Sequence, residues 1–125
     1  MNHETLTSYC EKLPEVETSL PFGPQTLVFK VAGKLFALLS LDVARINLKC
    51  DPDQAERLRE EHICVEPGYH MNKKHWNSIY WEREALRPDD LKRWIRDSYE
   101  LIIAKLPKKD RDRLQSSLAD AKPYK

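Results

Sequence analysis

Glycine is scarce in this sequence, with only three among 125 residues. A loop that cradles phosphate groups needs several glycines close together, so a glycine-rich nucleotide-binding loop is excluded. Cysteine is equally scarce, and the three cysteines, Cys10, Cys50 and Cys64, are an odd number at unrelated spacings. This pattern does not fit a disulfide framework, so we expect reduced thiols and a cytoplasmic protein.

Long hydrophobic runs and a strong net charge are also missing. The longest apolar stretch, Leu35 to Leu39, is far shorter than the roughly 20 residues that a membrane-spanning helix needs. The N-terminus shows neither the basic nor the apolar segment of a secretory signal. Lys and Arg number 21 against 20 Asp and Glu, and a net charge of +1 identifies no partner by itself. We therefore expect no contact with a membrane.

The composition is that of a folded domain, with 41% apolar and 33% charged residues. A chain of this length can bury a core of its own. Internal repeats, low-complexity segments and long linkers are absent from the sequence. We expect a single domain over residues 1–125, a monomer, with a disordered tail from about residue 119.

Helical periodicity marks both ends of the chain. Leu6, Tyr9, Cys10 and Leu13 recur at the spacing of one helix face before Pro14 ends the segment. Asp51 followed by Pro52 is a typical helix start, and the short helix that it opens is expected to end near His62. The longest stripe predicts a helix from Pro88 to Leu106, and its members are Leu91, Trp94, Ile95, Ser98, Tyr99, Ile102 and Leu106. Pro107 then begins a last helix with Leu114 and Leu118 on its buried face.

The middle of the chain predicts strands. Two β-rich runs, Leu27 to Val31 and Lys34 to Leu39, are separated by Ala32-Gly33, which is a hairpin signal. A strand over Val43 to Lys49 alternates from residue 44, so Arg45, Asn47 and Lys49 are expected on a solvent-exposed face. Further extended segments are predicted at Glu15 to Leu20, Ile63 to Val65 and Trp76 to Trp81.

This order of elements predicts an α+β fold. An N-terminal helix, several strands joined by short hairpins and long C-terminal helices fit a two-layer sandwich. We expect an antiparallel sheet of about five strands, covered by helices on one face and open on the other.

Several short segments, in order along nearly the whole chain, resemble the MmcQ/YjbR family. The most recognisable is HMNKKHWNSIY at residues 70–80; the others are FKV at 29–31, KLFA at 34–37, NLK at 47–49, DSY at 97–99 and LP at 106–107. The resemblance implies a sandwich of the CyaY-like or secretion-chaperone-like kind. It also implies DNA binding through a double wing of hairpins, which is an expectation drawn from the fold, and a fold alone does not confer a function.

Basic and polar side chains near the predicted hairpins form the candidate DNA-binding surface. Lysine and arginine neutralise phosphates, asparagine reads base edges and aromatic rings stack on unpaired bases. The candidate residues are Lys30, Lys34, Arg45, Asn47, Lys49, Lys73, Lys74 and His75. The alternative for this surface is a solvated sheet face with no ligand.

Catalytic and metal-dependent functions find little support in the sequence. Cys50, His62, Cys64, His70 and His75 lie in one stretch, but no Cys-x-x-Cys pair is present. A cysteine beside a histidine could act as a nucleophile with its base, yet the sequence does not show such a pair in a recognisable spacing. We therefore expect no enzyme activity, no cofactor and no metal.

A protein-interaction module is the remaining alternative. Antiparallel two-layer folds offer a sheet face or edge to partners. The acidic residues Glu11, Glu15 and Glu17 could face a basic partner or could simply be solvated.

Overall fold

The computed structural model describes residues 1–120 and has an α+β architecture, as predicted. In chain order the elements are α1 (His3–Glu11), β1 (Val16–Ser19), β2 (Thr26–Val31), β3 (Lys34–Ser40), β4 (Arg45–Lys49), α2 (Pro52–Glu61), β5 (Val65–Pro67), β6 (Trp76–Ile79), α3 (Pro88–Ile103) and α4 (Lys108–Asp120). No helix within residues 1–120 is long and apolar enough to cross a membrane. The last helix includes residues 119 and 120, and the rest of the predicted tail lies outside the described residues.

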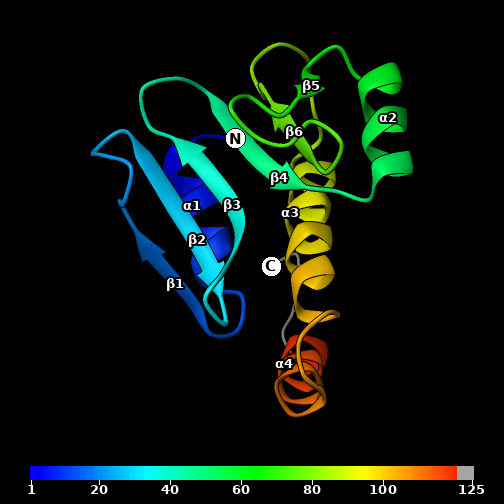
Figure 1. Cartoon of the computed structure of the whole chain (residues 1–125). Helices are drawn as coiled ribbons and strands as arrows, with labels where there is room; N and C mark the ends of the chain where they lie inside the picture. Colours follow the sequence, from blue (N-terminus) through cyan, green and yellow to red (C-terminus); the bar gives the residue numbers. More distant parts are fainter. Residues whose placement is uncertain (121–125) are drawn as a thin grey trace.

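The strands form one antiparallel sheet in the order β1-β2-β3-β4-β6-β5 (Figure 1). Six strands are present where the sequence predicts about five, because the short extended segment after α2 joins the sheet as β5. The predicted hairpin between β2 and β3 is confirmed. Ala32 and Gly33 both have positive φ angles, 51° and 75°, which is the pattern of a tight type I′ turn.

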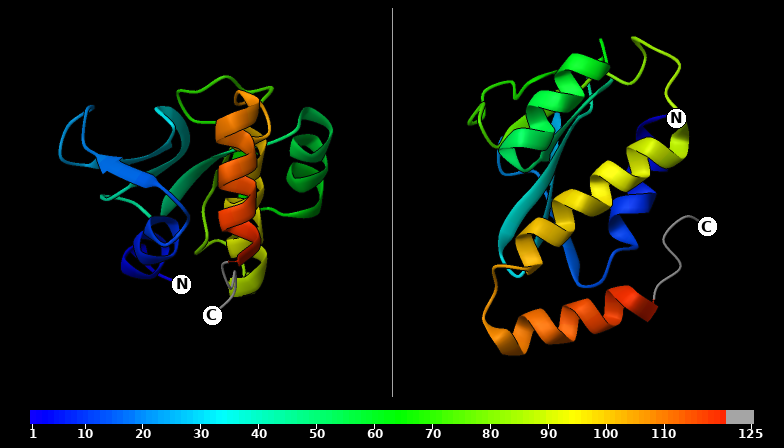
Figure 2. Two further views of the ribbon diagram at one scale, coloured as in Figure 1. Left: turned by 90° about the horizontal axis from the view of Figure 1, so that it is seen from below. Right: turned by 90° about the vertical axis from the view of Figure 1, so that its right-hand side faces the viewer.

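Helices α1 and α3 cover one face of the sheet (Figure 2). The side chains of the predicted α3 stripe are all buried in the main core, together with Phe29, Phe36 and Leu39 from the strands. Ser98 fixes the height of α3 on the sheet. Its hydroxyl donates to the carbonyl of Phe36 at 2.6 Å and accepts from the backbone N–H of Lys49 at 2.9 Å.

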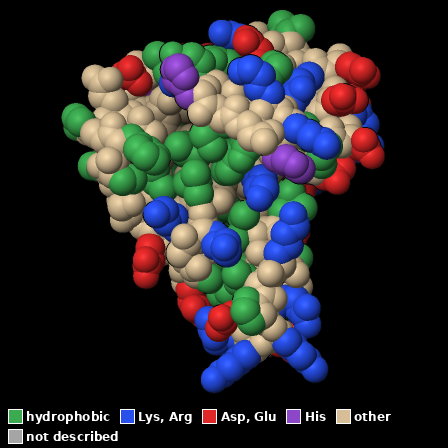
Figure 3. Space-filling model, viewed as in Figure 1, with side chains coloured by type: hydrophobic (Ala, Val, Ile, Leu, Met, Phe, Trp, Pro, Cys, Tyr) green, Lys and Arg blue, Asp and Glu red, His purple; other side chains and the backbone are tan. Residues whose placement is uncertain are grey.

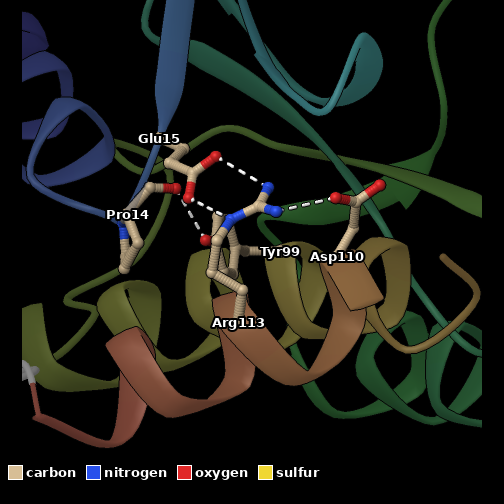
Figure 4. A network of polar contacts seen from close by, with 5 residues as sticks. All are labelled: Pro14, Glu15, Tyr99, Asp110 and Arg113. Carbon is tan, nitrogen blue, oxygen red and sulfur yellow. Dashed lines mark hydrogen bonds and ion pairs between the residues drawn. The ribbon is translucent and has the colours of Figure 1, made fainter. Parts of the chain in front are cut away.

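Contacts between distant segments hold α4 beside the start of β1 (Figure 4). The Arg113 guanidinium donates to both carboxylate oxygens of Glu15, at 2.8 and 3.0 Å, and to Asp110 at 2.7 Å. The hydrogen bond from Arg113 lowers the pKa of Glu15. Beneath this network the Tyr99 hydroxyl donates to the carbonyl of Pro14 at 2.7 Å. The turn that leads into β1 is therefore tied to both C-terminal helices.

The opposite face of the sheet, here called the outer face, has a small core of its own. Val28, Leu38 and Trp76 are buried there, with Leu35 and Met71 packed against them. The β5–β6 loop crosses this face and brings Met71 onto it. The loop begins at Gly68, which lies against β6. A glycine fits here because a Cβ atom at this position would lie only 2.7 Å from the Cβ of Trp76. The outer face is therefore neither fully covered nor fully solvated.

Candidate functional site

The centre of the outer face is a hollow of about 300 Å³. It is bounded by β3 and β4, by the β5–β6 loop and by the loop before β2. Its lining consists of Phe22, Thr26, Leu38, Ser40, Arg45, Asn47, Tyr69, His70 and Met71. Figure 3, viewed from this side, shows hydrophobic side chains gathered over the sheet, with Lys and Arg side chains below and to the right.

Two aromatic side chains project at the edges of the hollow. Phe22 is 69% exposed and Tyr69 is 47% exposed, which are large values for aromatic residues. Leu20, near Phe22 in the same β1–β2 loop, is also exposed. Large apolar side chains left in water around a concave surface are typical of a binding site for another molecule.

Arg45 forms the polar wall of the hollow. Its guanidinium group lies over the ring of Tyr69, 4.2 Å from the centroid, and its Nε donates to the Ser40 hydroxyl at 3.1 Å. The predicted outward direction of Arg45 is therefore correct. However, the side chain is half-buried and already has partners, so part of its hydrogen-bonding capacity is used inside the protein.

The expectation that Asn47 faces solvent is wrong. Its side chain lies on the outer face as predicted, but the residue is only 6% exposed because the β5–β6 loop covers it. Its amide donates to the carbonyl of Tyr69 at 3.2 Å and accepts from the hydroxyl of Ser78 at 2.5 Å. Asn47 thus holds the loop in place and is not available to read a base edge.

Three lysines come together at the opposite end of the sheet from the hollow, near the end of α3. Lys34 begins β3, Lys49 ends β4, and Lys105 lies in the turn after α3. Burial lowers the pKa of Lys49 most, and the positive charges of Lys105 and Lys34 lower it further. Within residues 1–120 no lysine has an ion-pair partner, so the repulsion is not relieved. Lys105 is missing from the sequence prediction, because nothing in the sequence relates the end of α3 to β4.

Lys30 also lies on the outer face, half-buried in β2. Its cross-strand neighbours are Glu17 in β1 and Leu35 in β3. Glu17 is exposed, so a negative charge lies across from Lys30 on the edge strand β1.

The last three predicted residues, Lys73, Lys74 and His75, end the β5–β6 loop. Hydrogen bonds to the backbone shape this segment. The Arg59 guanidinium donates to the carbonyl of Lys73, and the Cys50 N–H donates to the carbonyl of His75 at 2.7 Å. Lys73 and Lys74 are exposed, while His75 is half-buried. The next residue, Trp76, is paired with Lys49, so the loop ends beside the lysine cluster.

The thiols and histidines considered for catalysis do not form a common site. Within residues 1–120 no group of three His, Cys, Asp or Glu side chains could hold a metal ion. Cys10 and Cys64 are fully buried, and burial raises the pKa of Cys64 to about 12. His62 is bonded to Glu84 at 3.0 Å. A thiol with so high a pKa is a poor nucleophile.

Known proteins resemble this chain over almost its whole length. The YjbR family model matches residues 11–101. The uncharacterized protein YbdF of Escherichia coli O157:H7 is 42% identical over 115 residues, which cover 90% of this chain and 93% of YbdF. The uncharacterized protein YjbR of Escherichia coli K12 is 32% identical over 89% of this chain and 95% of its own.

A solved structure supports the same relationship. The crystal structure of the Deinococcus radiodurans protein DR2400, which has a DUF419 domain, superposes with a TM-score of 0.81 and 35% identity. The match covers 90% of this chain and 86% of that one. Sequence segments, family model and architecture agree, and the chain belongs to the YjbR family.

Proposed function

We propose that the protein is a binding module whose outer sheet face holds a segment of another polypeptide. The segment would carry apolar side chains together with aspartate or glutamate. One observation supports this most strongly: the sheet carries an apolar hollow with two exposed aromatic rings at one end and lysines without an ion-pair partner at the other. Apolar side chains of the partner would fill the hollow, and its carboxylates would reach Lys34, Lys49 and Lys105.

The apolar character of the hollow favours a polypeptide over a nucleic acid. Aromatic and methionine side chains are enriched in protein interfaces, and burying them gains free energy only where the partner is apolar too. A DNA backbone presents charged phosphates and would leave Leu38 and Met71 without suitable contacts. The basic end of the face then serves to select acidic partners and to speed their approach.

Short labelled peptides test this proposal by fluorescence anisotropy. A peptide rich in aspartate, leucine and phenylalanine should bind. A version with lysine in place of aspartate, and another with alanine in place of the apolar residues, should bind at least about tenfold more weakly, since each loses about 1.4 kcal/mol or more. Equal binding of all three peptides, or none, would contradict the proposal.

A matched pair of variants locates the binding site. Phe22→Ala removes an exposed ring beside the hollow. Ile63→Ala removes a side chain near β5 from a residue that is 78% exposed. Neither side chain contributes to the core, so both variants should fold normally. Peptide affinity should fall for Phe22→Ala and stay unchanged for Ile63→Ala.

DNA binding is the second candidate, and the lysine cluster favours it. The repulsion between like charges held close together is reduced when phosphates approach them. The double variant Lys34→Glu with Lys105→Glu reverses two exposed charges of this cluster. The control, Lys12→Glu with Arg93→Glu, makes the same charge change at two exposed positions outside the cluster. If the protein binds DNA, only the first double variant should lose affinity for random duplex, and binding by the unmodified protein should weaken steeply with salt. Salt-insensitive or absent duplex binding would leave the polypeptide proposal alone.

A further inference from the structure

A second hollow, of about 290 Å³, lies on the helical side of the sheet between α2 and α3. The right-hand view of Figure 2 looks onto this side of the molecule. The walls are mainly apolar: Leu48 and Ile79 come from the strands, and the helices contribute Leu58, Trp94, Leu101 and Ala104. This hollow shares no lining residue with the hollow on the outer face, and Lys49 is the one member of the lysine cluster that reaches it.

Three of the residues that line this hollow are acidic. Asp97 on α3 is half-buried, and Asp51 and Glu100 are exposed at the rim. Glu100 lies 3.7 Å from Arg96, but Asp97 has no ion pair within the described part of the chain. Burial raises the pKa of Asp97 most, while a hydrogen bond from Gln54 and the more distant charges of Arg93 and Arg96 act in the opposite direction. The carboxylate is thus partly desolvated without a cation against it.

The remaining polar lining residues are Lys49, Cys50, Gln54 and Asn77. The thiol of Cys50 is neutral at physiological pH, since burial and the nearby Asp97 and Asp51 raise its pKa to about 11. Lys49 is the only basic residue in the lining, and the three carboxylates outnumber it.

We propose that this hollow binds a small organic amine, with an apolar ring between α2 and α3 and an ammonium group donating hydrogen bonds to Asp97. A neutral ligand would leave the Asp97 carboxylate without a cationic partner, and an acidic ligand would meet Asp97, Asp51 and Glu100. Hydrogen bonds between charged groups are the stronger kind, and removing water around Asp97 strengthens them further. The volume is at the lower limit for ligand pockets, so a single ring with a short chain is the expected size.

Three probes of nearly equal shape test this inference: phenethylamine, phenethyl alcohol and hydrocinnamate. Each is titrated into the protein with backbone amide NMR shifts as the readout. Phenethylamine should shift signals of Asp97, Leu101 and Ala104 and bind at least about tenfold more tightly than the alcohol, equivalent to about 1.4 kcal/mol. Hydrocinnamate should not saturate the site.

Two variants and one control complete the experiment. Asp97→Asn should reduce the affinity for the amine to that for the alcohol, whereas Asp89→Asn, an exposed carboxylate at the start of α3, should change nothing. Ala104→Trp fills the hollow from its exposed edge and should abolish binding of the amine, which keeps the test valid if Asp97→Asn fails to fold. Equal affinities for amine and alcohol, shifts confined to other surfaces, or full amine binding in a folded Asp97→Asn or Ala104→Trp protein would overturn the inference.

Discussion

At the scale of single residues, Gly68 shows how a missing side chain shapes the outer face. Its N–H donates to the carbonyl of Trp76 at 2.8 Å, and an added Cβ would lie 2.7 Å from the Cβ of Trp76 and 3.0 Å from that of Met71. Gly68→Ala should therefore push the β5–β6 loop away and cost about 1–3 kcal/mol in urea denaturation. Peptide binding in the hollow should weaken in the same variant. A loss of stability below about 0.5 kcal/mol would show that the loop can move aside freely.

Glu84 gives a residue-scale prediction about pH. The hydrogen bond from His62, followed by that from the Cys64 N–H at 3.0 Å, lowers the pKa of Glu84 to about 2, from an ordinary value of 4.5. Because the folded pKa is the lower one, this stabilisation is complete above about pH 4.5 and is lost as the pH falls toward 2.

Melting temperatures measured across this pH window provide the check. In Glu84→Gln the acid-induced loss should be smaller than in the unmodified protein. Glu82→Gln, which changes an exposed carboxylate two residues away, should behave like the unmodified protein. Identical acid profiles for all three proteins would contradict the role given to Glu84.

At the scale of elements, α3 is joined to the sheet by one serine as well as by its apolar stripe. Ser98 is fully buried, and its hydroxyl links the backbone of β3 to that of β4. Ser98→Ala should leave the N–H of Lys49 without this partner and destabilise the fold by about 1–3 kcal/mol. Ser116→Ala, on the exposed face of α4, is the matched control and should have little effect. Equal stabilities of the two variants would refute the proposed link.

Two kinds of contact attach α4 to the rest of the molecule: surface ion pairs and buried apolar contacts. Leu114 is fully buried, whereas the side chains of Arg113 and Glu15 are nearly half exposed. Leu114→Ala should cost about 2–5 kcal/mol. Arg113→Ala should have a clearly smaller effect, because exposed ion pairs are screened by water and salt. The ranking is measured by urea denaturation, and the reverse order would show that the network in Figure 4 carries most of the attachment.

At the scale of the whole molecule, thiol reactivity reports global unfolding. Cys10 and Cys64 are both 0% exposed, and burial raises the pKa of each thiol. In native protein without Cys50, made as Cys50→Ser, an aromatic disulfide reagent should react only at the rate at which the core opens. Rapid modification of both thiols under native conditions would indicate that the main core opens locally.

Sequence patterns predict most of this architecture, and the physical reason is that local periodicity carries the information. The α3 stripe, the Asp51 helix start and the hairpin at Ala32-Gly33 are all confirmed. The candidate site is predicted less well. Alternation along β4 indicates which side chains leave the main core, but it cannot show that the β5–β6 loop covers Asn47 or that Lys105 approaches Lys49. Such contacts join segments far apart in the chain and have no local signal.

The two ends of the sheet have a consequence for self-association. At one edge β1 has only four residues, and at the other β5 has three and ends at Pro67, which has no N–H to donate. Short edge strands that include proline are a common protection against edge-to-edge pairing and fibril growth. The molecule can therefore leave apolar side chains uncovered on its outer face with little risk that the sheets of two molecules will pair edge to edge. It also follows that an extended partner has only short edge strands to pair with, so it would bind across the outer face and not as an added strand.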